Sequence, residues 1–229
     1  MAQRVQVHFF ASARRLGDRL CEEIATGCAA DGALVALAVG RTTLPHYAGL
    51  DPSAALLEGK TFIPVDELVP APASPSASFS SQLRSALPPK LARRVSEICV
   101  RDPARSSERL ESWVESAGLA LCVLGLGPDG HIAFNQPGSG PETRTRLVEI
   151  LPENLSRLGD VRPATHALTL GIASLLSAER ILLVVDGGGK QCALDRVIRG
   201  PEASDMPASF LRCHPDCQVL VVGDRPPQQ

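Results

Sequence analysis

The sequence predicts an α/β fold: a doubly wound, mostly parallel sheet in a single domain over residues 1–229. Short apolar runs, each long enough for one strand, recur along the chain, and segments with helical spacing of apolar residues lie between them. This alternation is typical of a parallel sheet with helices on both faces. A chain of 229 residues also suffices to bury a substantial core.

The apolar runs give the expected order of elements. Strands are predicted over 5–9, 34–39, 61–65, 119–124, 181–185 and 218–222, and helices over 11–24, 91–98 and 190–198. Pro64 lacks a backbone donor, so the third strand is expected at a sheet edge or a bulge. The segment 69–90, rich in Pro, Ser and Ala, is predicted to be a loop, and the tail 224–229 is expected to be frayed.

Composition and charge exclude several classes of protein. The net charge of -2 gives no general electrostatic reason for binding nucleic acid or an anionic membrane. There is no apolar stretch of transmembrane length and no signal-peptide core, so a cytoplasmic protein is expected. The seven cysteines are scattered and odd in number, which indicates reduced thiols. The run 213–217 (CHPDC) has no second ligand pair at metal-site spacing and is predicted to be a turn, with no metal.

The strongest chemical signal follows the predicted strand 119–124. There Asp129 and His131 are separated by Gly130, in a run of glycines and prolines. Ligands of open α/β sheets bind at the carboxyl ends of the strands. A carboxylate two residues from an imidazole can fix its tautomer and support its protonated form. The alternative is a helix cap beside a histidine with a purely structural role.

Three further candidates also follow predicted strands. Gly40-Arg41-Thr42-Thr43 could cradle an anion or simply start a helix. Asp66-Glu67 could be a general base with a neighbour that raises its pKa, or an acidic helix start. Lys190, after three glycines, could neutralise a phosphate or be a solvated lysine. Together these groups predict a pocket for a sugar phosphate.

The run 124–135 (LGLGPDGHIAFN) resembles the signature of glucosamine-6-phosphate deaminases (isomerases), whose superfamily includes the 6-phosphogluconolactonases. The resemblance extends over nearly the whole chain, through 40–42, 66–67, 168–171 and 189–190. The last third, with 207–211, is similar to the galactosamine-6-phosphate isomerase branch. The resemblance implies a Rossmann-like sheet of the deaminase and ribose-5-phosphate isomerase type.

The implied reaction converts glucosamine 6-phosphate or galactosamine 6-phosphate to the ketohexose 6-phosphate and ammonia, without a metal or organic cofactor. By this resemblance Asp66 is the proton-shuttling base, and His131, oriented in part by Asp129, opens the sugar ring. Gln136 stands where the family usually has Glu. The implied substrate- and phosphate-binding positions are Gly40, Arg41, Thr42, Glu67, Gly130 and Lys190, with a further arginine that could be Arg157 or Arg162.

Three departures from the family pattern carry expectations. Gln136 can hold a histidine by hydrogen bonding but supplies no charge, so we expect slower ring opening than with Glu. The segment 149–165 is short for a mobile lid. Val148 replaces a basic allosteric ligand and leaves only Arg146 and Ser139, so we expect no activation by N-acetylglucosamine 6-phosphate, and a monomer or homodimer.

Two other functions stay open. A 6-phosphogluconolactonase would use the same histidine to activate water. Against it, lactonases usually have Arg where this chain has Leu68, and Thr-Ala-Ser where it has 132–134 (IAF). A sugar-phosphate-binding protein with weakened catalysis is the third possibility, with Gln136 as its first sign. The residues do not distinguish gluco from galacto substrates.

Overall fold

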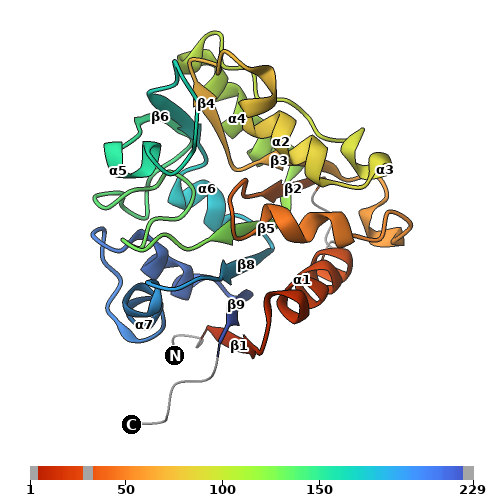
Figure 1. The fold of residues 1–229 in the computed structure, drawn as a ribbon. Helices are drawn as coiled ribbons and strands as arrows, with labels where there is room; N and C mark the ends of the chain where they lie inside the picture. Colours follow the sequence, from red (N-terminus) through yellow and green to blue (C-terminus); the bar gives the residue numbers. More distant parts are fainter. Residues whose placement is uncertain (1–4, 28–32, 224–229) are drawn as a thin grey trace.

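A six-stranded sheet, parallel at every strand pair, lies at the centre of the computed structural model, which describes residues 5–27 and 33–223 (Figure 1). Its strands, in spatial order, are β1 (Gln6–Phe10), β9 (Cys217–Val222), β8 (Arg180–Val185), β5 (Leu119–Gly125), β2 (Leu34–Leu37) and β3 (Thr61–Pro64). All six coincide with predicted runs. The strand that contains Pro64 is at an edge, as predicted, since proline cannot donate to a second neighbour.

Helices cover both faces of this sheet, which confirms the doubly wound fold class. The longer helices are α1 (Ala13–Gly27), α2 (Phe79–Ala86), α4 (Pro103–Ala117) and α7 (Gln191–Arg199), and the short ones are α3 (Pro89–Ala92), α5 (Pro152–Leu155) and α6 (Ile172–Leu176). Short 3-10 helices are η1 (Leu44–Gly49), η2 (Ala55–Leu57), η3 (Pro75–Ala77) and η4 (Pro207–Cys213). Figure 1 shows α1 and α7 on opposite sides of the strands.

The core divides by face because side chains alternate along each strand. In β2, Leu34 and Ala36 join the cluster with α4, α6 and α7, whereas Val35 and Leu37 join the one with α1, α2 and α3. Continuous apolar runs are therefore required, as in other parallel sheets buried on both faces.

A second, antiparallel sheet of three strands was not predicted. It consists of β4 (Asp66–Val69), β7 (His166–Thr169) and β6 (Arg146–Glu149), in that order. Only Val65 separates β3 from β4, so the chain passes from one sheet to the other beside Asp66. Leu68, Phe79 and Phe134 form a third apolar cluster with residues of the segment 149–165.

Two predictions between 69 and 98 were wrong. The expected loop 69–90 contains α2 and the first half of α3, and the expected helix 91–98 ends early, because α3 stops at Ala92. Val95 instead forms a parallel bridge with Phe62 of β3. Ser78 caps the start of helix α2, because its side chain accepts a hydrogen bond from the Ser81 N–H. The carboxylate of Glu67, distant in sequence, also binds the first turn of this helix. The expectation for 224–229 lies outside the described residues.

The run 213–217 is the predicted turn before the last strand. The buried His214 side chain bonds the carbonyl of Ala178 (2.6 Å) and accepts from the Asp216 N–H (3.1 Å), so both ring nitrogens are in use. No helix in the described ranges has the length and apolar character of a membrane span.

Candidate functional site

The order of the strands brings the predicted site segments together. Strands β8, β5, β2 and β3 are consecutive neighbours and all parallel, so their carboxyl ends meet at one edge of the sheet. Lys190 follows β8, the 129–131 turn follows β5, and the 40–43 turn follows β2. Asp66 follows β3. These segments are far apart in sequence, and the sheet alone makes them neighbours.

Asp66 is a buried carboxyl group with hydrogen-bond donors arranged on one oxygen. Its Oδ1 accepts from the Thr169 hydroxyl (2.5 Å) and from the Phe134 N–H (3.1 Å). Burial raises the pKa of Asp66 to about 7, because it outweighs the two donors and the nearby His131, while Glu67 adds to the rise. A carboxyl group with this pKa can take up and release a proton near neutral pH.

Asp129 holds the ring of His131. The two side chains meet at 2.6 Å between Nδ1 and Oδ1, and the same carboxylate accepts the His131 N–H (3.3 Å). Burial favours the neutral acid, but the contacts with His131 prevail and leave the pKa of Asp129 below its ordinary value. With Nδ1 held in this way, Nε2 is the nitrogen that a substrate would meet.

Glycines make room for this pair. A Cβ at Gly127 would stand 2.3 Å from Nδ1 of the His131 ring, and one at Gly130 would stand 1.9 Å from the Met206 sulfur. Gly130 also has a φ of +83°, in the region that favours glycine. Glycine is therefore required at both positions for steric reasons, at Gly127 by the imidazole and at Gly130 by Met206, and substrate binding by Gly130 stays a prediction.

The loop after His131 is fixed by buried polar contacts. Ala133 has a φ of 53°, uncommon for a residue with a side chain, and the next N–H, of Phe134, points at Asp66. Asn135 is fully buried; its amide donates to the carbonyls of Ile132 (3.1 Å) and Leu170 (2.8 Å). This loop thus connects the imidazole to the carboxyl group.

Sequence reasoning assigned no role to Thr169, although its hydroxyl makes the shortest contact of Asp66. The sequence does contain an indication of this role. Thr169 lies between two leucines in an apolar run, and a hydroxyl buried in such a strand requires a hydrogen-bond partner.

Arg41 and Lys190 form a cationic pair on neighbouring loops. Burial lowers the pKa of Lys190, and the charge of Arg41 lowers it further, against the opposing effect of Asp186. Two cations that repel each other favour a bound anion. Lys190 is also the residue before the first turn of α7, where backbone N–H groups are unpaired.

The turn at 40–43 has one structural and one open threonine. The Gly40 carbonyl accepts the N–H groups of Thr43 (3.1 Å) and Leu44 (3.0 Å), and the Thr43 hydroxyl donates to the Ala38 carbonyl (2.7 Å). The side chain of Thr42 instead lies against the end of β5, 3.1 Å from where a Cβ at Gly125 would stand. Of the two threonines, Thr42 is the one next to the carboxyl end of β5, where the 129–131 turn follows.

The carboxylate of Glu67 binds the N-terminus of helix α2. It is buried, and its carboxylate accepts the N–H groups of Phe79 and Ser80 (both 2.8 Å) and the Ser80 hydroxyl (2.7 Å). A carboxylate at a helix N-terminus is stabilised by the helix dipole. This geometry supports a role at the helix start, close to the alternative considered for this acid, and substrate contact by Glu67 stays a prediction.

Gln136 faces the segment 149–165. Its Nε2 donates to the Glu149 carbonyl (2.8 Å), and its Oε1 accepts from the Leu151 N–H (2.9 Å) and the Asn154 amide (3.3 Å). Within the described ranges, no hydrogen bond joins Gln136 to His131. The expected support of the imidazole by Gln136 is therefore not what this geometry shows.

The two candidate arginines differ in their partners. Arg157 donates to the side-chain oxygen of Asn154 (3.2 Å). Arg162 forms two bonds of 2.9 Å to Asp160, and its side chain is 86% exposed. Of the two, Arg157 is the one connected to the loop that carries the other site residues.

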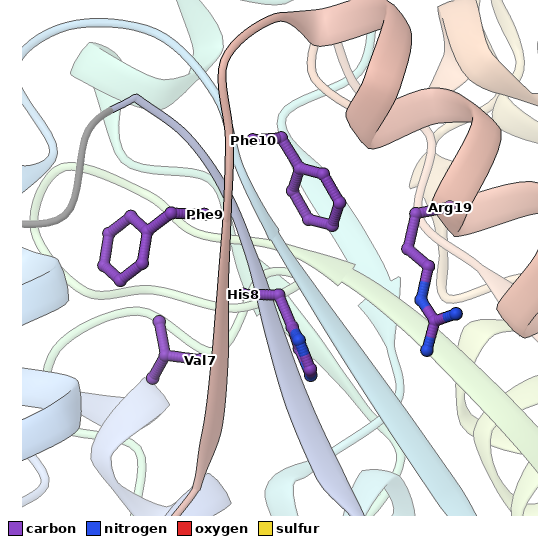
Figure 2. A pocket seen from close by; sticks show the side chains of 5 residues that line it. All are labelled: Val7, His8, Phe9, Phe10 and Arg19. Atoms are coloured by element: carbon purple, nitrogen blue, oxygen red, sulfur yellow. The ribbon is translucent and has the colours of Figure 1, made fainter.

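A cavity of about 420 Å³ lies elsewhere, along the edge strand β1. Val7, His8, Phe9, Phe10 and Arg19 line it (Figure 2). None of these is a predicted site residue, and they are far along the sheet from β3. We place the site at the strand ends, where the acid, the imidazole and the two cations converge.

Comparisons with known proteins show the family of the chain. The family model described as glucosamine-6-phosphate isomerases/6-phosphogluconolactonase matches residues 10–221. A glucosamine-6-phosphate deaminase of Rhodopirellula baltica is 44% identical over 112 residues, which are 47% of this chain and 45% of that protein. One of Leuconostoc citreum is 30% identical over 91% of each chain. The chain spans about half the length of the first curated relatives it matches.

Solved structures extend the likeness to the whole fold. A monomeric glucosamine-6-phosphate deaminase of the NagB superfamily has a TM-score of 0.84 and 25% identity, over 95% of this chain and 97% of that one. A 6-phosphogluconolactonase of Thermotoga maritima has a TM-score of 0.75 at 22% identity, over 96% and 100%, and shows the fold alone. With a family model matched over most of its length, the chain belongs to the glucosamine-6-phosphate isomerase/6-phosphogluconolactonase family.

Proposed function

We propose that the protein is a hexosamine-6-phosphate deaminase of the aldose–ketose isomerase type. It converts glucosamine 6-phosphate or galactosamine 6-phosphate to the ketohexose 6-phosphate and ammonia. The observation that carries this proposal is the buried Asp66, with a pKa of about 7, beside the paired His131 and Asp129. Curated relatives named glucosamine-6-phosphate deaminase support it.

Each group has one step. Arg41, Thr42 and Lys190 hold the phosphate, as the cationic pair and the open threonine suggest. His131 moves the proton of the C1 hydroxyl to the ring oxygen, so that the C1–O bond to the ring breaks and an aldehyde forms.

Asp66 then completes the isomerisation. It takes the proton from C2 while the C1 oxygen gains a proton released by the substrate's ammonium group, which leaves an enol with an amino group, and it then returns its proton to C1. The resulting iminium at C2 adds water and expels ammonia, which yields the ketone. A base with a pKa near the working pH is suited to both proton transfers.

Lactone hydrolysis is the competing activity of the same family. Lactone hydrolysis requires an imidazole to activate water. It includes no proton transfer that would need a second, buried acid such as Asp66, with a pKa of about 7. The acid therefore favours the deaminase.

One assay separates these activities. Purified protein is incubated with glucosamine 6-phosphate, galactosamine 6-phosphate and 6-phosphogluconolactone, while ammonia release and lactone loss are followed. We expect ammonia from at least one amino sugar. Asp66→Asn should reduce that release at least about a hundredfold, in the range for a general base, with phosphate affinity retained. Asp160→Asn, the same change at an exposed acid, is the matched control and should leave the release unchanged. Absence of ammonia from both amino sugars would overturn the proposal.

We also propose that the protein acts as a monomer or homodimer, without activation by N-acetylglucosamine 6-phosphate. The monomeric deaminase of similar structure supports the first part. A hexamer in sedimentation, or a sigmoidal rate curve that this compound makes hyperbolic, would contradict the proposal.

A further inference from the structure

The amide of Gln136 is bonded at both ends to a segment that follows it in sequence. Its Nε2 donates to the Glu149 carbonyl (2.8 Å), and its Oε1 accepts the Leu151 N–H (2.9 Å). A carbonyl can only accept and an N–H can only donate, so these two backbone groups determine which end of the amide is which. Only a side chain with a donor and an acceptor satisfies both.

A second amide continues this chain of contacts. Asn154 is buried; its Nδ2 donates to Oε1 of Gln136 (3.3 Å), and its Oδ1 accepts from Nη1 of Arg157 (3.2 Å). The side chain of Gln136 is thus two hydrogen bonds from a guanidinium. Arg162, in the same segment, is paired instead with Asp160 and forms a natural control.

The other end of this chain lies in the loop of the proposed active site. Gln136 follows His131 by five residues, and Phe134, between them, donates its N–H to Asp66 (3.1 Å). Phe134 also stacks on Phe79, with ring centres 6.2 Å apart, in the apolar cluster that holds Ile150. The loop that orients the proton-transfer groups therefore also carries the anchor of the segment 149–157.

We propose that Gln136 is a positioning residue: it holds the segment 149–157 against the loop 131–136 and, through Asn154, orients Arg157, the candidate arginine for the substrate phosphate. Glutamate at this position would set a carboxylate oxygen against the Glu149 carbonyl, and one hydrogen bond would be lost. The substrate part of this inference rests on the proposed function, whereas the hydrogen-bonded connection does not.

Kinetics of Gln136→Ala, Gln136→Glu, Arg157→Ala and Arg162→Ala test the substrate part. We expect both Gln136 variants to raise KM for the amino sugar phosphate roughly five- to tenfold, because Arg157 would lose part of its charged contact with the phosphate, with kcat within about twofold. The midpoint of the pH–rate profile should not move. Arg162→Ala should behave like the parent protein.

A double-mutant cycle shows whether the two side chains act together. If Gln136 acts through Arg157, the double variant Gln136→Ala/Arg157→Ala should have the KM of Arg157→Ala alone. Additive effects on KM would overturn the proposal. So would a shifted pH profile with KM unchanged, because that result would place the effect of Gln136 on the proton-transfer groups.

Hydrogen exchange tests the connection without any activity. The Leu151 amide should exchange faster in Gln136→Ala than in the parent protein and in Arg162→Ala. Unchanged exchange at Leu151 would overturn the proposal. If the parent protein releases no ammonia but this amide exchanges faster in the variant, the proposed function fails and the connection stands.

Discussion

Replacing Asp66 with asparagine is expected to stabilise the protein, and by more at higher pH. The pKa of this acid is about 7 in the folded protein, against an ordinary value of 3.8, because burial disfavours the charged form. The unfolded chain releases this proton first as the pH rises. Stability is therefore lost between about pH 4 and pH 7, and the loss persists above pH 7. Asparagine keeps the acceptor oxygen for Thr169 and Phe134 but carries no charge.

The magnitude follows from the difference in pKa. A separation of about three pKa units corresponds to roughly 4 kcal/mol above the folded pKa, and to roughly 2 kcal/mol at about pH 5, where the unfolded acid is mostly ionised. The conversion is justified because the side chain is 7% exposed. The advantage of Asp66→Asn should thus grow by about 2 to 3 kcal/mol between about pH 5 and pH 8.5.

Urea unfolding at these two pH values measures this difference. Fluorescence of the one tryptophan, Trp113 of α4, reports the transition. Asp160→Asn is the control: Asp160 is exposed, and its hydrogen bond with Arg162 lowers its pKa to about 2, so its replacement should give no gain at high pH. An advantage of Asp66→Asn that is equal at both pH values would refute the assigned pKa and its cause.

Three further substitutions test individual contacts of the site. Thr169→Val removes a donor from Asp66 and should raise the pKa of this acid by about one unit; the carboxyl carbon shift in a pH titration measures it, and an unmoved midpoint would count against the contact. Lys190→Ala should weaken binding of inorganic phosphate about tenfold by calorimetry, and unchanged affinity would remove Lys190 from the anion site. Gly127→Ala should displace the His131 ring and reduce ammonia release about a hundredfold at an unchanged circular dichroism spectrum; full activity would contradict the close approach.

The central sheet could be predicted because the burial of each of its strands is visible in that strand's own residues. A strand buried on both faces must be apolar at every position, as 119–124 is, and its order in the sheet does not alter that requirement. The strands of the second sheet have four residues each, and β6 alternates half-buried and exposed positions, which gives no comparable signal.

Helix α2 escaped prediction for a different reason. Its first turn is bonded by Glu67, an acid from a strand that precedes it by twelve residues, so its stabilisation is not local in sequence. The Pro- and Ser-rich stretch before it has the composition of a loop, and part of it is one.

The sequence by itself determined the residue types of the site and the strand ends that bear them, because glycines and polar residues after apolar runs are local features. Only the tertiary structure decided how those residues act. The burial of the Asp66 carboxyl group, which the residues around it in the sequence do not indicate, raised its pKa toward neutrality. Glu67 binds the first turn of α2, and Gln136 binds the backbone of the segment 149–157. These hydrogen bonds join residues distant in sequence, so they depend on where the folded backbone places the two partners.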